Sequence, residues 1–501
     1  MNNKLIFYCI CILLCTSCIK QINLYAGDED EDKEGGHDGG KKEEPQEPVY
    51  LYPFGNEVQE DITTDILIKI KDAPQAPLKA GMPYLKYNKS LLLMLVQDDC
   101  RQSAYCRTWA AINGKPVSTS EPFPAPNDQE PDKTRQLYYN SAQLKKGDLP
   151  PNILPAKHTL GSTDGTGKEV RFAFTTTLAA EEDWMEAAVD VAPGYEGDYF
   201  RFYEKRGLNW DEVKEMMNYG VGIAFHDVKA SNVNDMGEIV QHYETAQKKI
   251  QQQLSGRKCK MLARPNGNNT YIDAAMQYED ILTMTTESNG KYLYPFREMG
   301  SLDKVAIMRS FETLQINIKD EIRIQRRASE ISRKAVHIGV HNTDNAWIKL
   351  LEWINDTYGK DGDDSVWFPS QEEYYEYNHY RTHGNVEVAQ SDGNTIRLTV
   401  HLPVREGFYY PSVTVNLEGI KAEDIVSIET DDAISGLSYD NYKKGIMLNI
   451  DCRKYLAEHA THYVEQYEKD KENASNKEDA LYFVNMLKDS ERKTALLNRI
   501  Q

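Results

Sequence analysis

The sequence predicts an α/β protein: a distorted (β/α) barrel of about seven to eight strands, with a small antiparallel β domain after it. Three observations lead to this fold class. Between residues 85 and 384, short apolar runs alternate with segments of helical periodicity, as in parallel strands joined by helices. From Asn385 the apolar period changes to two, which is typical of antiparallel strands. A chain of 501 residues, 40% of them hydrophobic, suffices for one large domain and a small one.

The leader at residues 1–18, MNNKLIFYCICILLCTSC, has a lysine near its start, then a short apolar stretch and small residues before Cys18. The apolar stretch is too short to span a bilayer and suits the core of a signal peptide. The ending Thr16-Ser17-Cys18 resembles a bacterial lipoprotein cleavage box. That resemblance implies lipidation of Cys18 and anchoring at the outer membrane or cell surface; the alternative is an ordinary secretory signal.

Two segments separate the leader from the predicted barrel. Residues 19–48 contain the acidic run AGDEDEDKEGGHDGGKKEEPQEP, which cannot bury apolar surface and is expected to form a disordered tether. Residues 49–84 form an N-terminal β segment, because Ile66, Ile68 and Ile70 alternate as in a strand. The chain is thus expected to carry its folded part at the end of an acidic linker.

Eight strand candidates lie within residues 85–384. They are LLLMLVQ, VRFAFTTT, GVGIAFH, KMLARP, ILTMTT, VAIMRS, AVHIGVH and SVWFPS. Two helices between them carry clear end signals. Residues 209–220 begin with the capping box Asn209 and Glu212 and end at a glycine. Residues 344–359 place apolar side chains on one face and also stop at a glycine.

Three further regions complete the chain. An insertion at residues 107–168, rich in Pro, Asn, Gly and Asp, follows the first barrel strand, where long insertions shape or cover a site. Residues 385–452 form the small antiparallel β domain. Residues 453–501 form a charged tail that is helical by propensity. Cys100 and Cys106 are close enough in sequence for a disulfide in an exported protein.

The formal charge of −20 limits the partners of the chain. No basic stripe compensates for the excess of carboxylates, so the composition argues against binding to nucleic-acid phosphates. Neutral or cationic glycans remain acceptable partners on electrostatic grounds. The charge therefore favours a glycan over a nucleic acid.

Polar side chains follow four of the predicted strands. They are Asp98-Asp99, His226-Asp227, Arg264 and His341. In a parallel barrel the carboxyl ends of the strands meet at one mouth, where chemistry is assembled. A carboxylate and a histidine there could hold a divalent metal, while a second carboxylate and a second histidine transfer protons. An arginine beside the basic carboxylate would keep it ionised.

These motifs, in this order, resemble those of the polysaccharide deacetylases, the NodB-homology domains of carbohydrate esterase family four. The family's T-F-D-D-G corresponds to LVQDDC, its H-S/T-x-x-H to FHDVKA, its R-x-P-x-G to ARPNG and its L-x-H to IGVH. The resemblance covers residues 85–381. It implies N- or O-deacetylation of a glycan with a divalent metal, zinc or similar.

The resemblance also implies a role for each residue. Asp98 corresponds to the general base, Asp99 and His226 to metal ligands, Arg264 to the arginine that holds the base, and His341 to the general acid. The family's second metal histidine falls on Ala230, which cannot bind a metal, and Asp227 is the candidate for a third ligand. Cys100 replaces a glycine, so the turn after the acidic pair must accommodate a side chain.

Two functions therefore remain open. The first is a cell-surface, metal-dependent deacetylase of a glycan. The second is a catalytically degenerate barrel that binds a glycan, which Ala230 favours. Asp98-Asp99 could also be a solvated turn and His226 a hydrogen-bonded core residue. A barrel glycosidase is discounted, because its two carboxylates would stand roughly 5 Å apart on separate strands.

Overall fold

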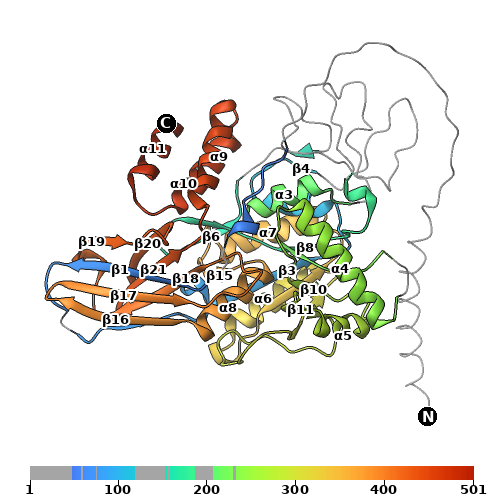
Figure 1. Cartoon of the computed structure of the whole chain (residues 1–501), viewed down its shortest axis with the longest axis horizontal. Coiled ribbons are helices and arrows are strands. Elements are labelled where there is room, and N and C mark those ends of the chain that lie inside the picture. The colour runs from blue at the N-terminus through green and yellow to red at the C-terminus, as the bar shows by residue number, and fades with distance from the viewer. Residues whose placement is uncertain are drawn as a thin grey trace. The chain divides into compact units, whose positions relative to one another are not determined.

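Short parallel strands joined by helices form the largest part of the fold (Figure 1). The computed structural model describes residues 48–57, 60–74, 76–118, 153–154, 158–186, 207–229 and 233–501. Of these, Val49–Gln501 belong to one compact unit. The leader with Cys18, the tether up to residue 47 and Ala230 lie outside the described residues.

All eight predicted barrel runs contain a strand. The parallel strands are β3 (Leu91–Gln97), β8 (Thr175–Thr177), β9 (Gly222–Ala224), β10 (Met261–Ala263), β11 (Thr283–Thr286), β12 (Ala306–Met308), β13 (Ser310–Phe311), β14 (Val336–Val340) and β15 (Val366–Trp367). β3 is buried along its whole length, because β8, β14 and β15 pair with it. This central position explains why its sequence is a continuous apolar run.

The parallel strands form two sheets, of order β13-β14-β3-β8-β9 and β10-β11-β12. Phe225, the residue after β9, joins them through two backbone hydrogen bonds: its N–H donates to Met261 at 2.8 Å and its carbonyl accepts from Ala263 at 2.9 Å. At the other end, Arg309 alone separates β12 from β13. The chain is therefore a mixed α/β protein with parallel central strands, as the apolar runs predict.

Helices follow most of the parallel strands. They are α2 (Ala110–Ile112), α3 (Trp210–Asn218), α4 (Met236–Gln253), α5 (Asn269–Gln277), α6 (Gln315–Arg327), α7 (Asn345–Tyr358) and α8 (Gln371–His383). A π-helical segment, Ala104–Trp109, leads into α2. The predicted capping box of α3 is confirmed: Asn209 accepts from the Glu212 N–H at 3.0 Å, and Glu212 accepts from the Asn209 N–H at 2.9 Å.

Two antiparallel sheets lie beside the parallel strands in Figure 1. Their strands are β1 (Ile62–Ile70), β2 (Lys79–Gly81), β16 (Asn385–Asp392), β17 (Thr395–Leu402), β18 (Ser412–Glu418), β19 (Ile425–Thr430), β20 (Gly436–Tyr442) and β21 (Gly445–Asp451). Their orders are β16-β17-β1-β19 and β2-β18-β21-β20. The N-terminal β segment is thus part of these sheets, since β1 pairs with β17 and β19 and β2 with β18.

The charged C-terminal segment forms α9 (Leu456–Lys469), α10 (Ala474–Met486) and α11 (Glu491–Ile500). It is helical, as its composition predicts, but it is more than a tail. Leu456, Val464 and Phe483 are buried in the hydrophobic core that the helices share with the parallel strands. The charged residues therefore cover the outer faces of helices whose apolar faces complete the core.

The described ends of the predicted insertion are ordered in two antiparallel pairs, β4 (Val117–Ser118) with β5 (Ile153–Leu154) and β6 (Gly161–Thr163) with β7 (Glu169–Arg171). The rest of the insertion lies outside the described residues. Cys100 and Cys106 are buried free thiols, so the disulfide that the sequence allowed is not formed.

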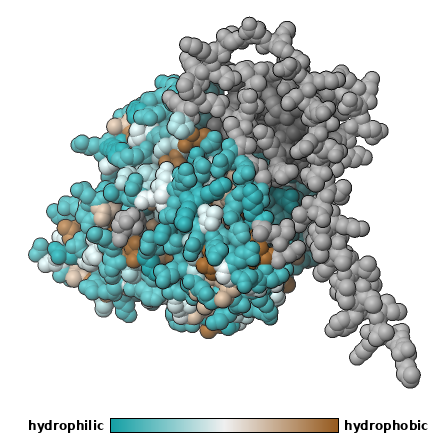
Figure 2. All heavy atoms as spheres, turned by 45° about the vertical axis from the view of Figure 1, so that its right-hand side comes forward, coloured by the Kyte–Doolittle hydropathy of each residue, from teal (hydrophilic) through white to brown (hydrophobic). Residues whose placement is uncertain are grey.

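The face shown in Figure 2 is mostly hydrophilic, with hydrophobic residues scattered over it. Among the described residues, no helix has the length and apolar content needed to cross a membrane.

Candidate functional site

The predicted site residues lie at the carboxyl ends of neighbouring parallel strands. Asp98 follows β3, His226 stands two residues after β9, Arg264 follows β10 and His341 follows β14. The backbone N–H of Asp98 donates to Val340, the residue before His341, at 2.8 Å. The strand order therefore brings residues from distant parts of the sequence to one edge of the parallel strands.

Asp98 is a buried carboxylate held by Arg309. Its side chain is 2% exposed, and the two terminal nitrogens of Arg309 donate one to each of its oxygens, at 2.7 and 2.8 Å. This bidentate pair fixes the plane of the carboxylate. Each oxygen keeps a second acceptor site, because a carboxylate offers about four lone-pair positions. One of its oxygens also lies 3.8 Å from Nε2 of His226.

The chain turns sharply at Asp99. Asp99 and Cys100 both adopt left-handed backbone angles, with φ of 63° and 49°. Such angles are strained for residues other than glycine, so Cys100 adopts with strain the left-handed conformation that the family's glycine would adopt freely. The turn leaves Asp99 35% exposed, with Arg101 donating to it at 2.9 Å. The two adjacent carboxylates are therefore compensated by different cations.

His226 lies between the two carboxylates. Its Nε2 is 3.4 Å from Oδ1 of Asp99, and its Nδ1 donates to the carbonyl oxygen of Ala263 at 2.8 Å. Although burial opposes the charged form, Asp98 and Asp99 raise the pKa of His226 to about 9. Burial also raises the pKa of Asp99, but His226 and Arg101 outweigh it and hold that pKa below its ordinary value.

Arg264 does not contact Asp98, and this corrects the expectation that it holds the base. Its guanidinium donates to Glu287 at 2.9 Å, to Asn269 at 2.7 Å and to the Ser288 hydroxyl at 2.9 Å. Glu287 also accepts from Arg309 at 2.7 and 2.9 Å. The charges thus alternate along a chain from Asp98 through Arg309 and Glu287 to Arg264. The guanidinium of Arg264 reaches the base through that chain, and the backbone carbonyl of Arg264 also accepts from Arg309 at 3.3 Å.

His341 lies on the exposed side of the same edge. The ring of His341 stacks on the ring of Phe311 with the centroids 5.0 Å apart. The guanidinium of Arg309 lies 4.8 Å from the centroid of the Phe311 ring. His337, four residues earlier, is buried, and burial together with Arg309 lowers its pKa to about 3. Of the two histidines, only His341 is open to solvent.

A cavity of about 290 Å³ opens beside Asp99 and His226. Its walls also include Asp227, Glu181, His242 and Tyr243. The Asp227 carboxylate already accepts from the Tyr271 hydroxyl at 2.7 Å and from Asn266 at 3.3 Å. The backbone N–H of Val228 also donates to it at 3.0 Å, so Asp227 is held by neutral donors although it lines the same cavity as the candidate ligands.

Asp99 and His226 fit two corners of a metal site. Two ligands bound at about 2.0–2.1 Å to one tetrahedral cation stand about 3.4 Å apart, which is the distance observed between Oδ1 and Nε2. The hydrogen bond from Nδ1 to Ala263 orients Nε2 toward Asp99, as in metal-bound histidines. Among the described residues, the one group of three ligand types within reach of each other is elsewhere: His158, Asp356 and Asp361. The strand-end site thus offers two of the three protein ligands usual for catalytic zinc.

A family model described as "Putative polysaccharide deacetylase" matches residues 64–501. The chain belongs to this polysaccharide deacetylase family. The match extends beyond the motifs around Asp98 and His341 to include β1, the antiparallel sheets and the C-terminal helices. Among curated proteins, none matches the sequence.

The sequence reasoning missed Arg309 and Glu287. Both stand at strand ends, in VAIMRS and just after ILTMTT, where the rule that selected Arg264 applies equally. A search for every charged residue at the end of an apolar strand would have found them. The sequence does not give the direction of each side chain, so it could not decide which arginine reaches Asp98.

Proposed function

We propose that the chain is a cell-surface deacetylase that hydrolyses N- or O-acetyl groups on a glycan with the help of a divalent metal. Family membership implies a glycan substrate. The observation that carries the proposal is the meeting of Asp98, Asp99 and His226, with Nε2 of His226 3.4 Å from one carboxylate and 3.8 Å from the other.

The parallel strands close into one seven-stranded barrel, with β15 as an additional strand beside β3. The supporting pairings run from β3 through β8, β9, β10 and β11 to the segment β12–β13, which pairs with β11 on one side and β14 on the other. β14 returns to β3. The candidate site then occupies the carboxyl face, where such barrels carry their chemistry.

Asp98 accepts a proton from the water that attacks the acetyl carbonyl carbon. His341, exposed at the same edge, donates a proton to the departing nitrogen or oxygen as its bond to that carbon breaks, and acetate leaves. Arg309 holds the Asp98 carboxylate in place through its two hydrogen bonds. A cation held by Asp99 and His226 supplies Lewis-acid polarisation of the acetyl group when it is bound.

Acetate release with metal added tests this proposal. Purified protein is incubated with acetylated chito-oligosaccharides, acetylated xylan and peptidoglycan fragments, each with zinc, cobalt or nickel. We expect acetate from at least one substrate and a loss of more than about a hundredfold in Asp98→Asn, since general bases contribute that much. No acetate from any of them, or an unchanged rate in Asp98→Asn, would overturn the proposal.

Zinc titration needs a matched control, because His158, Asp356 and Asp361 form a second group of ligand types. We expect His226→Ala to remove one equivalent of bound zinc and Asp361→Asn to leave that equivalent in place. The reverse pattern would assign the metal to the other group.

The second candidate function is glycan binding by a degenerate barrel. The observation that favours it is that the described residues supply only two ligands at the strand-end site. Such a protein binds a glycan without releasing acetate and takes up no stoichiometric zinc at that site. An Ala230→His variant that gains zinc and activity would identify the missing ligand as the cause.

Lipidation of Cys18 and anchoring at the outer membrane or cell surface complete the proposal. Both rest on the leader sequence. Mass spectrometry of the membrane fraction, compared between the natural chain and Cys18→Ser, tests them: we expect the variant to lose both the lipid and the membrane association.

A further inference from the structure

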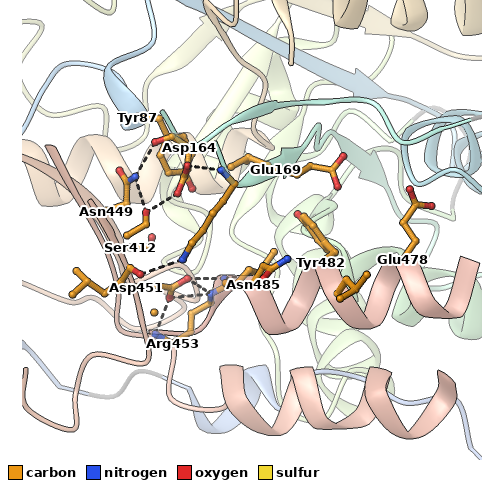
Figure 3. A pocket seen from close by; sticks show the side chains of 17 residues that line it. Tyr87, Asp164, Glu169, Ser412, Asn449, Asp451, Arg453, Glu478, Tyr482 and Asn485 are labelled. Carbon is orange, nitrogen blue, oxygen red and sulfur yellow. Dashed lines mark hydrogen bonds and ion pairs between the residues drawn. The ribbon is translucent and has the colours of Figure 1, made fainter. Parts of the chain in front are cut away.

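Figure 3 shows the residues that line a second cavity, of about 240 Å³. Three regions meet there: the β6–β7 hairpin, the antiparallel sheet of β18, β21 and β20, and α10. The hairpin leads into β8, so it lies on the amino-terminal side of the parallel strands, whereas Asp98 and His226 follow their carboxyl ends. The cavity is therefore separate from the candidate catalytic site.

The floor of this cavity is a fixed polar network. The hydroxyl of Ser438 donates to the carboxylate of Asp164 at 2.6 Å, and the amide of Asn449 donates to the Asp164 carbonyl at 2.8 Å. Beside them, Arg453 donates to both oxygens of Asp451, at 3.1 Å to Oδ1 and 2.6 Å to Oδ2. Because these groups hold one another, a ligand would meet polar atoms already in position.

Backbone strain places Tyr87 in the wall. Tyr87 and Asn88 are consecutive residues with left-handed angles, φ of 60° and 55°. Side chains of β18 hold this turn: the Tyr87 N–H donates to the Thr414 hydroxyl at 2.8 Å, and the amides of Asn88 and Asn416 donate to each other at 2.8 Å. Strain kept in place by specific contacts is a mark of functional positions.

Helix α10 forms the opposite wall and supplies polar groups to it. Glu478, Tyr482 and Asn485 lie along it facing the cavity (Figure 3). Glu478 and Asn485 are exposed, and within the described part of the chain neither side chain has a hydrogen bond or ion pair. A carboxylate accepts and an amide both accepts and donates, which suits the hydroxyls and amine of a sugar.

The charge of the lining selects among ligands. Four carboxylates, Asp164, Glu169, Asp451 and Glu478, face two cations, Lys168 and Arg453. Arg453 is already paired with Asp451, and the Lys168 ammonium donates to the Leu437 carbonyl at 3.3 Å. Glu169 is paired with Lys360 and lies 3.5 Å from Arg171, so the carboxylates of Asp164 and Glu478 remain against the ammonium of Lys168. This excess of one negative charge disfavours phosphates and uronic acids and favours an amine.

We propose that this cavity is a non-catalytic binding site for a sugar residue that carries no negative charge, with an amino sugar preferred over an acetylated one. Its volume is below the ~300–1,000 Å³ of sites for drug-sized ligands, so it takes a short piece of a chain. The inference rests on the proposed function in taking a glycan as the partner. An amino sugar is what N-deacetylation leaves, so this site retains the treated polymer while the strand-end site acts elsewhere on it.

Calorimetric titration of the full chain with sugar oligomers tests this proposal. The probes are oligomers of glucosamine, of N-acetylglucosamine and of galacturonic acid. We expect the glucosamine oligomer to bind most tightly and the galacturonic acid oligomer not to bind. Glu478→Gln and Asn485→Ala should each weaken glucosamine-oligomer binding about tenfold, equivalent to 1.4 kcal/mol.

Two matched variants serve as controls. Lys477→Ala alters an exposed residue of the same helix outside the cavity, and Asp98→Asn alters the catalytic edge; both should bind the glucosamine oligomer as the natural chain does. The proposal is overturned if no oligomer binds, if the acidic oligomer binds as tightly as the amino one, or if Glu478→Gln and Asn485→Ala change nothing. Failure of the deacetylase proposal would instead show as missing acetate with sugar binding intact.

Discussion

Replacing Arg309 by methionine tests whether Arg309 holds Asp98, as in the structure, or whether Arg264 does, as the sequence motifs implied. Arg309 is fully buried, and its guanidinium makes two hydrogen bonds to Asp98 and two to Glu287, between 2.7 and 2.9 Å. Methionine keeps much of the volume but removes the charge and the N–H groups that make these hydrogen bonds. Asp98, whose side chain is 2% exposed, then remains buried without its cation.

The expected cost follows from that burial. Removing one partner of a buried ion pair destabilises a protein by about 3–5 kcal/mol, because the other charge is left uncompensated. Glu287 is 27% exposed and keeps Arg264, so it adds little to this cost. The double variant Arg309→Met/Asp98→Asn removes both charges. It should therefore be less destabilised than the sum of the single variants by about 2 kcal/mol.

Urea unfolding and acetate release together provide the assay. Arg264→Met is the matched control, because it removes an equally buried arginine from the same charge chain without touching Asp98. We expect Arg309→Met to lose both stability and activity and Arg264→Met to retain more of each. The reasoning is refuted if Arg309→Met unfolds within about 0.5 kcal/mol of the natural chain, or if Arg264→Met is the variant with the larger loss of activity.

Three further predictions concern other parts of the molecule. Glu372 is fully buried and pairs with Arg257 at 2.8 Å. Glu372→Gln should therefore lower the free energy of unfolding by about 3–5 kcal/mol while leaving the activity per folded molecule unchanged. An unaffected urea midpoint would contradict this prediction. Burial lowers the pKa of His226, but Asp98 and Asp99 outweigh it and raise that pKa from 6.5 to about 9. Charged His226 therefore stabilises the metal-free fold fully below pH 6.5, and this contribution is lost as the pH rises through 9. Urea midpoints measured with a chelator should fall across that window in the natural chain but not in His226→Gln. Burial raises the pKa of the Cys100 and Cys259 thiols to about 12, and Cys106 and Cys452 are also buried thiols outside any disulfide. In a chain starting at residue 19, we therefore expect no thiol to react with a disulfide reagent in the native state and four to react after denaturation.

The parallel strands were readable from the sequence because most of them are buried by neighbours on both sides, which requires a continuous apolar run; β12 and β13 are only partly buried. β3 is the clearest case, since LLLMLVQ is buried at every position. Strand partners were not readable. Alternation at Ile66, Ile68 and Ile70 indicates which face of β1 is buried but not that β17 and β19 flank it. For the same reason the segment 49–84 could not be assigned to the antiparallel sheets.

The C-terminal helices show a second limit of composition. Lys and Glu dominate residues 453–501, which suggests a solvated tail, yet Leu456, Val464 and Phe483 are buried in the main core. A few apolar residues at helical spacing are enough to dock a helix whose other faces are charged. The charges therefore indicate the solvent-facing side of these helices, whereas composition alone does not show that their apolar faces join the main core.

The adjacent carboxylates at the end of β3 show how the fold tolerates two like charges in neighbouring residues. Asp98 continues the strand, so its side chain stays in the interior and meets Arg309. The left-handed turn at Asp99 and Cys100 directs the second carboxylate to the rim of the cavity, where Arg101 and His226 face it. Repulsion is thus reduced by separate cations rather than by solvent alone. The same turn makes the two carboxylates chemically different, since one is locked in a buried pair and the other is open to a cation or a substrate.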